Sequence, residues 1–168
     1  NCIPSISIIV SPYPNISSHF KDTGINVCTV SLERVFPKAK NFNFLPSIMA
    51  LQEANNNGFD DAFFKNHQGH ITEATTGNIF FFKEDNLFTT SSMILEGITR
   101  DFVIKTCKEL KINVIQKMFS LGELLNADEI FISGTTKLIL PVVKVDEKII
   151  KNGKPGDKTL ELKNILKK

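Results

Sequence analysis

The 168-residue chain has no excess of charge of one sign and no long apolar run. Its formal net charge is +2, and its lysines are scattered apart from the C-terminal Lys167-Lys168, so no basic surface for nucleic acid is predicted. No apolar segment is long enough to span a bilayer and no signal peptide is visible, so no membrane partner is expected either. Because 42% of the residues are hydrophobic and 23% are charged, we expect a globular protein. We also expect it to be located in the cytoplasm.

Cysteine and histidine are scarce, and neither has the spacing of a metal site. Cys2, Cys28 and Cys107 form an odd set without a CxxC pair, which indicates reduced thiols of an intracellular protein rather than disulfides. The three histidines lack ligand spacing, and two of them, His67 and His70, flank a tight turn where solvated side chains are usual. We therefore expect no metal.

Several motifs of common enzyme classes are also missing. No GxGxxG follows a predicted strand and there is no GxxxxGK[ST], so dinucleotide and P-loop sites are not supported. The GxSxG elbow of a serine nucleophile is absent as well. Any chemistry must come from polar groups arranged in another way.

Short strand-like segments alternate with a few helical ones. We expect strands at residues 5–10, 25–31, 61–65, 71–73, 78–83, 87–89, 113–118, 129–133 and 138–145. We expect helices at residues 44–56, 98–111, 120–126 and 157–168. Strands outnumber helices and several pair as hairpins, so the predicted fold class is α+β, with mostly antiparallel strands and flanking helices.

The apolar spacing in two of these helices predicts which side faces the core. Over residues 44–56 the side chains at helical spacing are Leu45, Ile48, Met49 and Leu51 or Gln52. Over residues 98–111 they are Phe102, Ile104 or Lys105, and Leu110. We expect both sets to point inward.

Two polar segments have the composition of anion-binding sites. Residues 97–101 open a helix, where free backbone N–H groups and the Thr99 hydroxyl are able to bind an anion. Residues 133–136, with the sequence SGTT, separate two apolar strands, and such a loop can bring N–H and O–H donors close to a phosphate. Taken singly, an ordinary helix cap and an ordinary hairpin turn explain these compositions better.

Two charged residues are open to more than one interpretation. Lys40 precedes the apolar stretch 42–49, where desolvation would make its amine nucleophilic, although by itself a surface lysine explains the position better. Glu73 lies just before the apolar residues 79–82, so its carboxylate is either a solvated turn residue or a buried, paired one. Composition does not decide between them.

Five segments, read in order, carry a stronger signal than any one of them. They are residues 40–45 (KNFNFL, followed by QEA at 52–54), 72–80 (TEATTGNIF), 97–100 (GITR), 127–136 (ADEIFISGTT, followed by PV at 141–142) and 146–156. Together they resemble the class IV pyridoxal-phosphate aminotransferases, over about residues 25–168. The resemblance implies the C-terminal, cofactor-holding domain of that family, with pyridoxal 5′-phosphate as cofactor.

The resemblance also implies a role for each residue around the cofactor. Lys40 would be the Schiff-base lysine, whose released amine carries a proton between the substrate Cα and the cofactor C4′. Glu73 would accept a hydrogen bond from the pyridine N1–H and keep the ring protonated, which makes the ring a better electron sink. Leu95 would pack against the ring face.

The phosphate and the substrate would lie on the threonine-bearing segments. The resemblance implies that Ile98 and Thr99 hold the phosphate at the helix N-terminus, and that Thr135 adds a hydroxyl or N–H donor. Thr136 would lie nearer the substrate carboxylate. Relatives also use an arginine from the N-terminal domain on the phosphate, and no counterpart of it lies in this chain.

The resemblance implies a transaminase that moves an amino group between an amino acid and a 2-oxo acid, and a homodimer. Branched-chain enzymes carry a tyrosine five residues after the lysine, where this chain has Leu45, so the lysine segment is closer to D-amino-acid aminotransferases. One alternative is 4-amino-4-deoxychorismate lyase, which releases pyruvate. Another is a truncated, inactive domain that only binds cofactor.

The beginning of the chain predicts that the domain is entered partway. Asn1 is followed almost at once by the predicted strand 5–10. We expect residues 1–35 to form the end of a small N-terminal domain and the interdomain connection, and residues 36–168 to form the cofactor-binding domain. On its own such a chain would be a weak or inactive catalyst.

Overall fold

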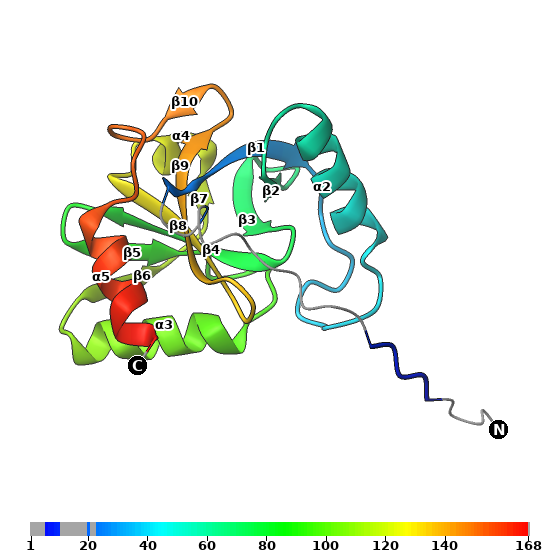
Figure 1. Ribbon diagram of the computed structural model, residues 1–168, viewed down its shortest axis with the longest axis horizontal. Helices are drawn as coiled ribbons and strands as arrows, with labels where there is room; N and C mark the ends of the chain where they lie inside the picture. Colours follow the sequence, from blue (N-terminus) through cyan, green and yellow to red (C-terminus); the bar gives the residue numbers. More distant parts are fainter. Residues whose placement is uncertain (1–5, 11–19, 21–22, 168) are drawn as a thin grey trace.

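The computed structural model describes residues 6–10, 20 and 23–167, and this part folds around one sheet of ten strands (Figure 1). The strands are β1 Ile25–Ser31, β2 Asp61–Lys65, β3 His70–Ala74, β4 Gly77–Lys83, β5 Asn86–Thr89, β6 Asn113–Gln116, β7 Phe119–Ser120, β8 Glu129–Gly134, β9 Leu138–Val145 and β10 Lys148–Ile149. The main helices are α2 Leu45–Asn56, α3 Ile98–Glu109, α4 Leu121–Leu125 and α5 Asp157–Leu166. Most pairings are antiparallel, so the predicted α+β class is confirmed.

Six of the strands close into a ring. The hydrogen-bonded order is β6-β5-β4-β8-β9-β1-β2-β3-β7, and β3 also pairs with β4. The ring therefore runs through β4, β8, β9, β1, β2 and β3, and the pair Glu73↔Asn78 lies where it closes. Strand β1 is parallel to both of its neighbours, β2 and β9.

The alternation of side chains along the strands separates two apolar cores. On β4, Ile79 and Phe81 belong to a cluster that draws residues from all six ring strands and so fills the ring. The next residues on the strand, Phe80 and Phe82, point the other way and pack under α3 and α5. Phe80 stacks on Phe131 with ring centroids 5.0 Å apart, a contact worth about 0.5–1.5 kcal/mol beyond its buried area.

Helix α2 packs with the opposite face to the one predicted from its large apolar residues. Its buried residues are Ser47, Ala50 and Ala54, and the two alanines contact Ala62 and Phe64 of β2. The predicted inward residues Leu45, Ile48 and Met49 are instead 58–64% exposed. The small alanine side chains allow a close approach to the strand, and this contact outweighs apolar spacing in setting the orientation.

Helix α3 also differs in part from its predicted face. Ile104 is buried as expected, but the other buried positions are Arg100, Val103, Thr106 and Cys107. Phe102 and Leu110 are about half exposed. Arg100 is charged, so apolar spacing alone would place it on the surface. It lies in the core because its guanidinium donates hydrogen bonds to the Thr90 carbonyl oxygen and to Gln116.

Residues 6–10, predicted as part of a strand, form no strand and lie away from the sheet (Figure 1). Ile6, Ile8, Ile9 and Val10 are at least 84% exposed. Apolar alternation allows a segment to join a sheet, but among the described residues no strand pairs with residues 6–10. Ser5 and most of the predicted loop 11–24, like Cys2 and His19, lie outside the described residues.

Three other expectations from the sequence concern the cysteines, a membrane span and the domain boundary. Cys28 and Cys107 are free thiols, and burial raises the pKa of Cys107 to about 11. Among the described residues, no helix combines the length and the hydropathy that a membrane span requires. The domain boundary near residue 35 stays a prediction, and β1, which precedes it, is hydrogen-bonded within the same sheet as β2 and β9.

Candidate active site

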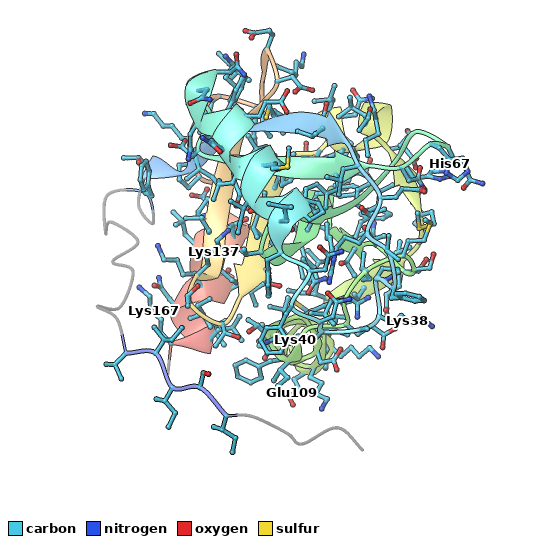
Figure 2. The ribbon with its side chains drawn as sticks, turned by 90° about the vertical axis from the view of Figure 1, so that its right-hand side faces the viewer. Lys38, Lys40, His67, Glu109, Lys137 and Lys167 are labelled. Carbon is cyan, nitrogen blue, oxygen red and sulfur yellow. The ribbon has the colours of Figure 1, made fainter. Side chains whose placement is uncertain are left out.

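The residues predicted to act together come from four segments. Lys40 lies in the lysine loop, residues 32–44 between β1 and α2, and Glu73 lies on β3. Ile98 and Thr99 begin α3, and Leu95 precedes it. Thr135 and Thr136 form the threonine turn, residues 135–137 between β8 and β9. Figures 1 and 2 show the lysine loop beside the N-terminal end of α3, with Lys40 in front of that helix.

Glu73 is a buried, paired carboxylate, which decides between the two interpretations left open by the sequence. Its relative exposure is 4%. Oε1 accepts a hydrogen bond from Arg34 Nη1 at 2.8 Å, and Oε2 accepts one from the Leu95 backbone N–H at 3.3 Å. Burial raises the pKa of Glu73, while the hydrogen bond and charge of Arg34, and then the Leu95 N–H, lower it in part.

Arg34 joins Glu73 to the lysine loop, and no motif in the sequence pointed to it. Besides its bond to Glu73, Arg34 donates from Nη2 to the carbonyl oxygen of Ala39 at 3.3 Å. Ala39 immediately precedes Lys40. One guanidinium therefore holds both the carboxylate and the backbone beside the lysine. The only sequence signal for it is a basic residue six positions before Lys40.

Lys40 itself is exposed on the lysine loop, as is Lys38. The aromatic side chain of Phe42, two residues later, is fully exposed. Desolvation, which the sequence offered as one way to activate this amine, is therefore not seen at Lys40. The loop leaves the amine free to reach a bound molecule, and Arg34 ties its backbone to the Glu73 side of the site.

The N-terminus of α3 is open to an anion. Its cap residue Gly97 is extended, with no side-chain cap bond, so first-turn N–H groups are available. Ile98 is 89% exposed and Thr99 half-buried. Asn78 fixes the approach to the helix by donating from Nδ2 to the Leu95 carbonyl oxygen at 2.7 Å. A Cβ on Gly97 would lie 2.7 Å from Asn78 Oδ1, so any other residue here would have to displace the Asn78 side chain.

The threonine turn lies beside the turn that follows Glu73. Register Asn78↔Ser133 between β4 and β8 brings the ends of the two hairpins together. A Cβ on Gly134 would come within 3.2 Å of the Thr76 carbonyl oxygen, so the two turns are closely packed. Thr135 and Thr136 are exposed beyond this contact, whereas the Ser133 hydroxyl is buried without a hydrogen-bond partner.

A second group of polar residues, which joins these two turns, was also not identified from the sequence. Asp61, at the start of β2, accepts from Lys137 Nζ at 2.6 Å and from Thr75 Oγ1 at 2.5 Å. Asp61 and Thr75 are buried, and the side chain of Lys137 is only 12% exposed. Lys137 belongs to the threonine turn (Figure 2) and Thr75 to the turn after Glu73. One carboxylate thus connects both.

The structure therefore brings a carboxylate, an open helix N-terminus, two exposed threonines and an exposed lysine to one end of the sheet. Glu73 and Leu95 are in direct contact, and Lys40 is linked to Glu73 through Arg34. Within the described part of the chain, no cluster of histidine, cysteine and carboxylate side chains has the geometry of a metal site. The arrangement suits a molecule with a protonated ring nitrogen at one end and a phosphate at the other.

This chain belongs to the class IV aminotransferase family, whose sequence model matches residues 1–145. A putative branched-chain-amino-acid aminotransferase of Methanocaldococcus jannaschii is 39% identical over 171 residues, which cover 98% of this chain and 58% of that protein. D-alanine aminotransferase of Bacillus licheniformis is 35% identical over 129 residues, 76% of this chain and 45% of that protein. The chain spans about half the length of the curated relatives it matches.

Solved structures of this family have the same fold. The branched-chain aminotransferase of Thermobaculum terrenum, in its pyridoxal-phosphate form, superimposes with a TM-score of 0.84 at 34% identity, covering 92% of this chain and 53% of that one. The branched-chain enzyme of Escherichia coli gives a TM-score of 0.81 at 33% identity, covering 86% and 51%. The predicted family and its fold are confirmed.

Proposed function

We propose that the protein transfers an amino group between an amino acid and a 2-oxo acid with pyridoxal 5′-phosphate as its cofactor. The observation that carries the proposal is the Glu73 carboxylate, buried and hydrogen-bonded to the Leu95 backbone, two residues before the open N-terminus of α3. A carboxylate near an anion-binding helix end matches a cofactor that has a basic ring nitrogen and a phosphate.

The residues present fit the two ends of this cofactor. A carboxylate has about four lone-pair positions, and two of those on Glu73 are filled by Arg34 and Leu95, so it is able to accept a ring N–H as well. The first-turn N–H groups at Ile98 and Thr99 would bind the phosphate, with a donor from Thr135. Leu95 would pack on the ring, and Thr136 would lie near the carboxylate of the substrate.

Bound pyridoxal phosphate supplies a ring that takes up the electrons released when an amino acid loses its Cα proton. Lys40 would hold the cofactor covalently and, once displaced by the substrate, carry the proton from Cα to the cofactor C4′. Glu73 would keep the ring nitrogen protonated. Arg34, with its charge beside Glu73, favours the ionised carboxylate that this task needs.

The substrate is the finer part of the proposal. The relatives named above include both branched-chain and D-alanine aminotransferases, so their names leave the amino donor open. Leu45 stands where branched-chain enzymes carry a tyrosine, and on that residue we propose a D-amino-acid donor. We also propose that the protein is a cytoplasmic homodimer. An assay with D-alanine and with L-leucine, each with 2-oxoglutarate, separates the two donors, and pyruvate release from 4-amino-4-deoxychorismate without an acceptor would indicate the lyase instead.

The decisive experiment for the cofactor is covalent mapping. Borohydride reduction of the cofactor-loaded protein followed by peptide mapping should place the pyridoxyl group on Lys40. Lys38 is the matched control, because it lies two residues away on the same exposed loop. A label on Lys38, or no label at either position, would overturn the assignment.

A further inference from the structure

The polar group formed by Asp61, Thr75 and Lys137 lies outside the residues assigned above, yet it contacts both turns of the candidate site. Asp61 Oδ2 accepts from Lys137 Nζ at 2.6 Å, and Asp61 Oδ1 accepts from Thr75 Oγ1 at 2.5 Å and from the Ala62 N–H at 2.8 Å. Lys137 is the last residue of the threonine turn, and Thr75 is two residues beyond Glu73. The bonds join segments 76 and 14 residues apart in sequence.

A buried ion pair is a weak source of stability, because removing two charges from water costs about as much as their attraction returns. The pair between Lys137 and Asp61 has side-chain exposures of 12% and 4%. Such a pair does fix geometry, because an unpaired charge in either position would be costly. We therefore expect the pair to fix the relative position of the two turns and to add little to the free energy of unfolding.

The threonine turn needs such an anchor. It projects Thr135 and Thr136 into solvent, and beyond the β8–β9 pairing Gly134↔Leu138 its residues have no ladder partner. Leu138, at the end of the turn, has a left-handed backbone with φ of 53°, a conformation that is costly for a branched side chain. Lys137 ties this turn to the start of β2, which lies on the other side of the β3–β4 turn.

We propose that Lys137 is a positioning residue, which through Asp61 holds the threonine turn where Thr135 reaches the phosphate of the cofactor. This inference rests on the proposed function. The Lys137 ammonium is itself engaged by Asp61, so it acts on the cofactor only through the turn. Loss of the anchor should weaken the phosphate end of binding and leave the ring end, held by Glu73 and Leu95, as it is.

The test compares two probes that differ only in the phosphate, pyridoxal 5′-phosphate and pyridoxal. In Lys137→Met the Kd for pyridoxal 5′-phosphate should rise about tenfold, the worth of one hydrogen bond, while the Kd for pyridoxal stays within about twofold. Lys137→Arg keeps the charge and should stay close to wild type for both probes. Lys144→Met is the matched control, because it removes an ion-paired lysine from the far end of β9, the strand that follows the threonine turn.

A second variant separates positioning from stability. Lys137→Met alone leaves Asp61 buried and unpaired, so it should lower the melting temperature. The double variant Asp61→Asn/Lys137→Met has no orphaned charge and should recover much of that melting temperature, yet keep the weakened pyridoxal 5′-phosphate binding. Recovery of both together, or equal weakening of both probes in Lys137→Met, would overturn the inference. If the wild-type protein binds neither probe, the proposed function fails first, and the inference with it.

Discussion

The lysine loop and the strand β3 contribute neighbouring parts of the candidate site, but they are built in different ways. In the lysine loop, Lys40, Phe42 and the following apolar side chains are exposed. The loop is tied to the sheet before Lys40, where the Leu32 N–H donates to the Lys65 carbonyl oxygen and Arg34 donates to Glu73. On β3, Glu73 is buried, both of its oxygens accept hydrogen bonds, and its strand is paired on both sides. One region leaves its reactive group free and the other fixes it.

This difference matches what each group would do in a transaminase. A lysine that binds the cofactor, leaves it and then carries a proton has to change position during the reaction. A carboxylate that keeps the ring nitrogen protonated works best when it does not move, because a preorganised charge needs no rearrangement in the transition state. In the proposed mechanism, exposure at Lys40 and burial at Glu73 would therefore be complementary.

The largest effect is expected at the exposed lysine, in the variant Lys40→Ala. Turnover should fall by about 10²–10⁴-fold, the usual contribution of a positioned acid–base group, with the additional loss of the covalent link. Because the side chain is exposed, the free energy of unfolding should change by no more than about 0.5 kcal/mol. Steady-state transamination and urea unfolding measure the two effects. Lys38→Ala should leave turnover unchanged, and a comparable loss there would contradict the assignment.

At the fixed end, Glu73→Gln should have a smaller effect. Turnover should fall by about one to two decades, because a charge-assisted hydrogen bond is worth on the order of 1.5–3 kcal/mol. The visible absorption of bound cofactor should persist, since the phosphate end is untouched. Glu109→Gln, an exposed carboxylate at the end of α3, is the matched control. Wild-type turnover in Glu73→Gln would count against a role at the ring nitrogen.

Arg34→Met cuts the connection between the two regions, and its signature is a change with pH. The pKa of Glu73 is raised by burial and lowered in part by Arg34, so loss of Arg34 should raise it further. A carboxyl whose pKa is raised on folding holds more protons in the native state, so the free energy of unfolding falls as pH rises from the unfolded to the folded pKa. That window should extend to higher pH in Arg34→Met.

Urea unfolding at a series of pH values, together with carboxyl NMR titration of the cofactor-free protein, would measure this effect. The variant should lose stability more steeply between acid and neutral pH than the wild type. Arg34→Met/Glu73→Gln is the control, since it lacks the titrating carboxyl and should lose the additional slope. Parallel profiles for Arg34→Met and wild type would show that Arg34 does not act on Glu73.

The smallest effect is expected on α2, the helix that the lysine loop leads into. Ile48 is 58% exposed, so Ile48→Ser should change the free energy of unfolding of this chain by about 0.5 kcal/mol or less. Ala54 is fully buried against β2, and Ala54→Leu should cost about 1–3 kcal/mol through overpacking. Denaturant unfolding compares the two. A larger loss for Ile48→Ser would mean that this face is covered in solution.

Most of the longer strands were predicted well because their signal is local. Alternation and short apolar runs predicted β1, β2 and β9 with the observed bounds. The family that the five segments indicated is confirmed by its sequence model, which matches residues 1–145 and so ends before the fifth segment. The orientation of α2 was not predictable in this way. Leu45, Ile48 and Met49 have the stronger apolar signal, but Ala50 and Ala54 make the contact, and a choice between small and large residues depends on the surface that faces the helix.

Residues of the candidate site could be named from the sequence only where they lie in a segment that resembles the family. Residues 40, 73 and 98–99 could be named, and their roles stay predictions. Arg34 and Lys137 could not be found, because what makes them relevant is a partner 39 or 76 residues away in sequence. Asn78 lay inside a quoted segment, but its bond to the Leu95 carbonyl oxygen depends on how the loop before α3 returns to β4.

The closed ring of strands has a consequence for the order of events during synthesis. Strand β1 leaves the ribosome more than 100 residues before one of its two neighbours, β9, with Ile25 paired to Val142. Until residues 138–145 have emerged, one side of β1 lacks its partner, and an unpaired strand edge is a template for the wrong association. Pairings this distant in sequence also form slowly. The threonine turn, between β8 and β9, emerges in the same late stretch, so ring closure and completion of the site coincide. A cofactor that binds only the completed site would then stabilise the chains whose ring has closed correctly.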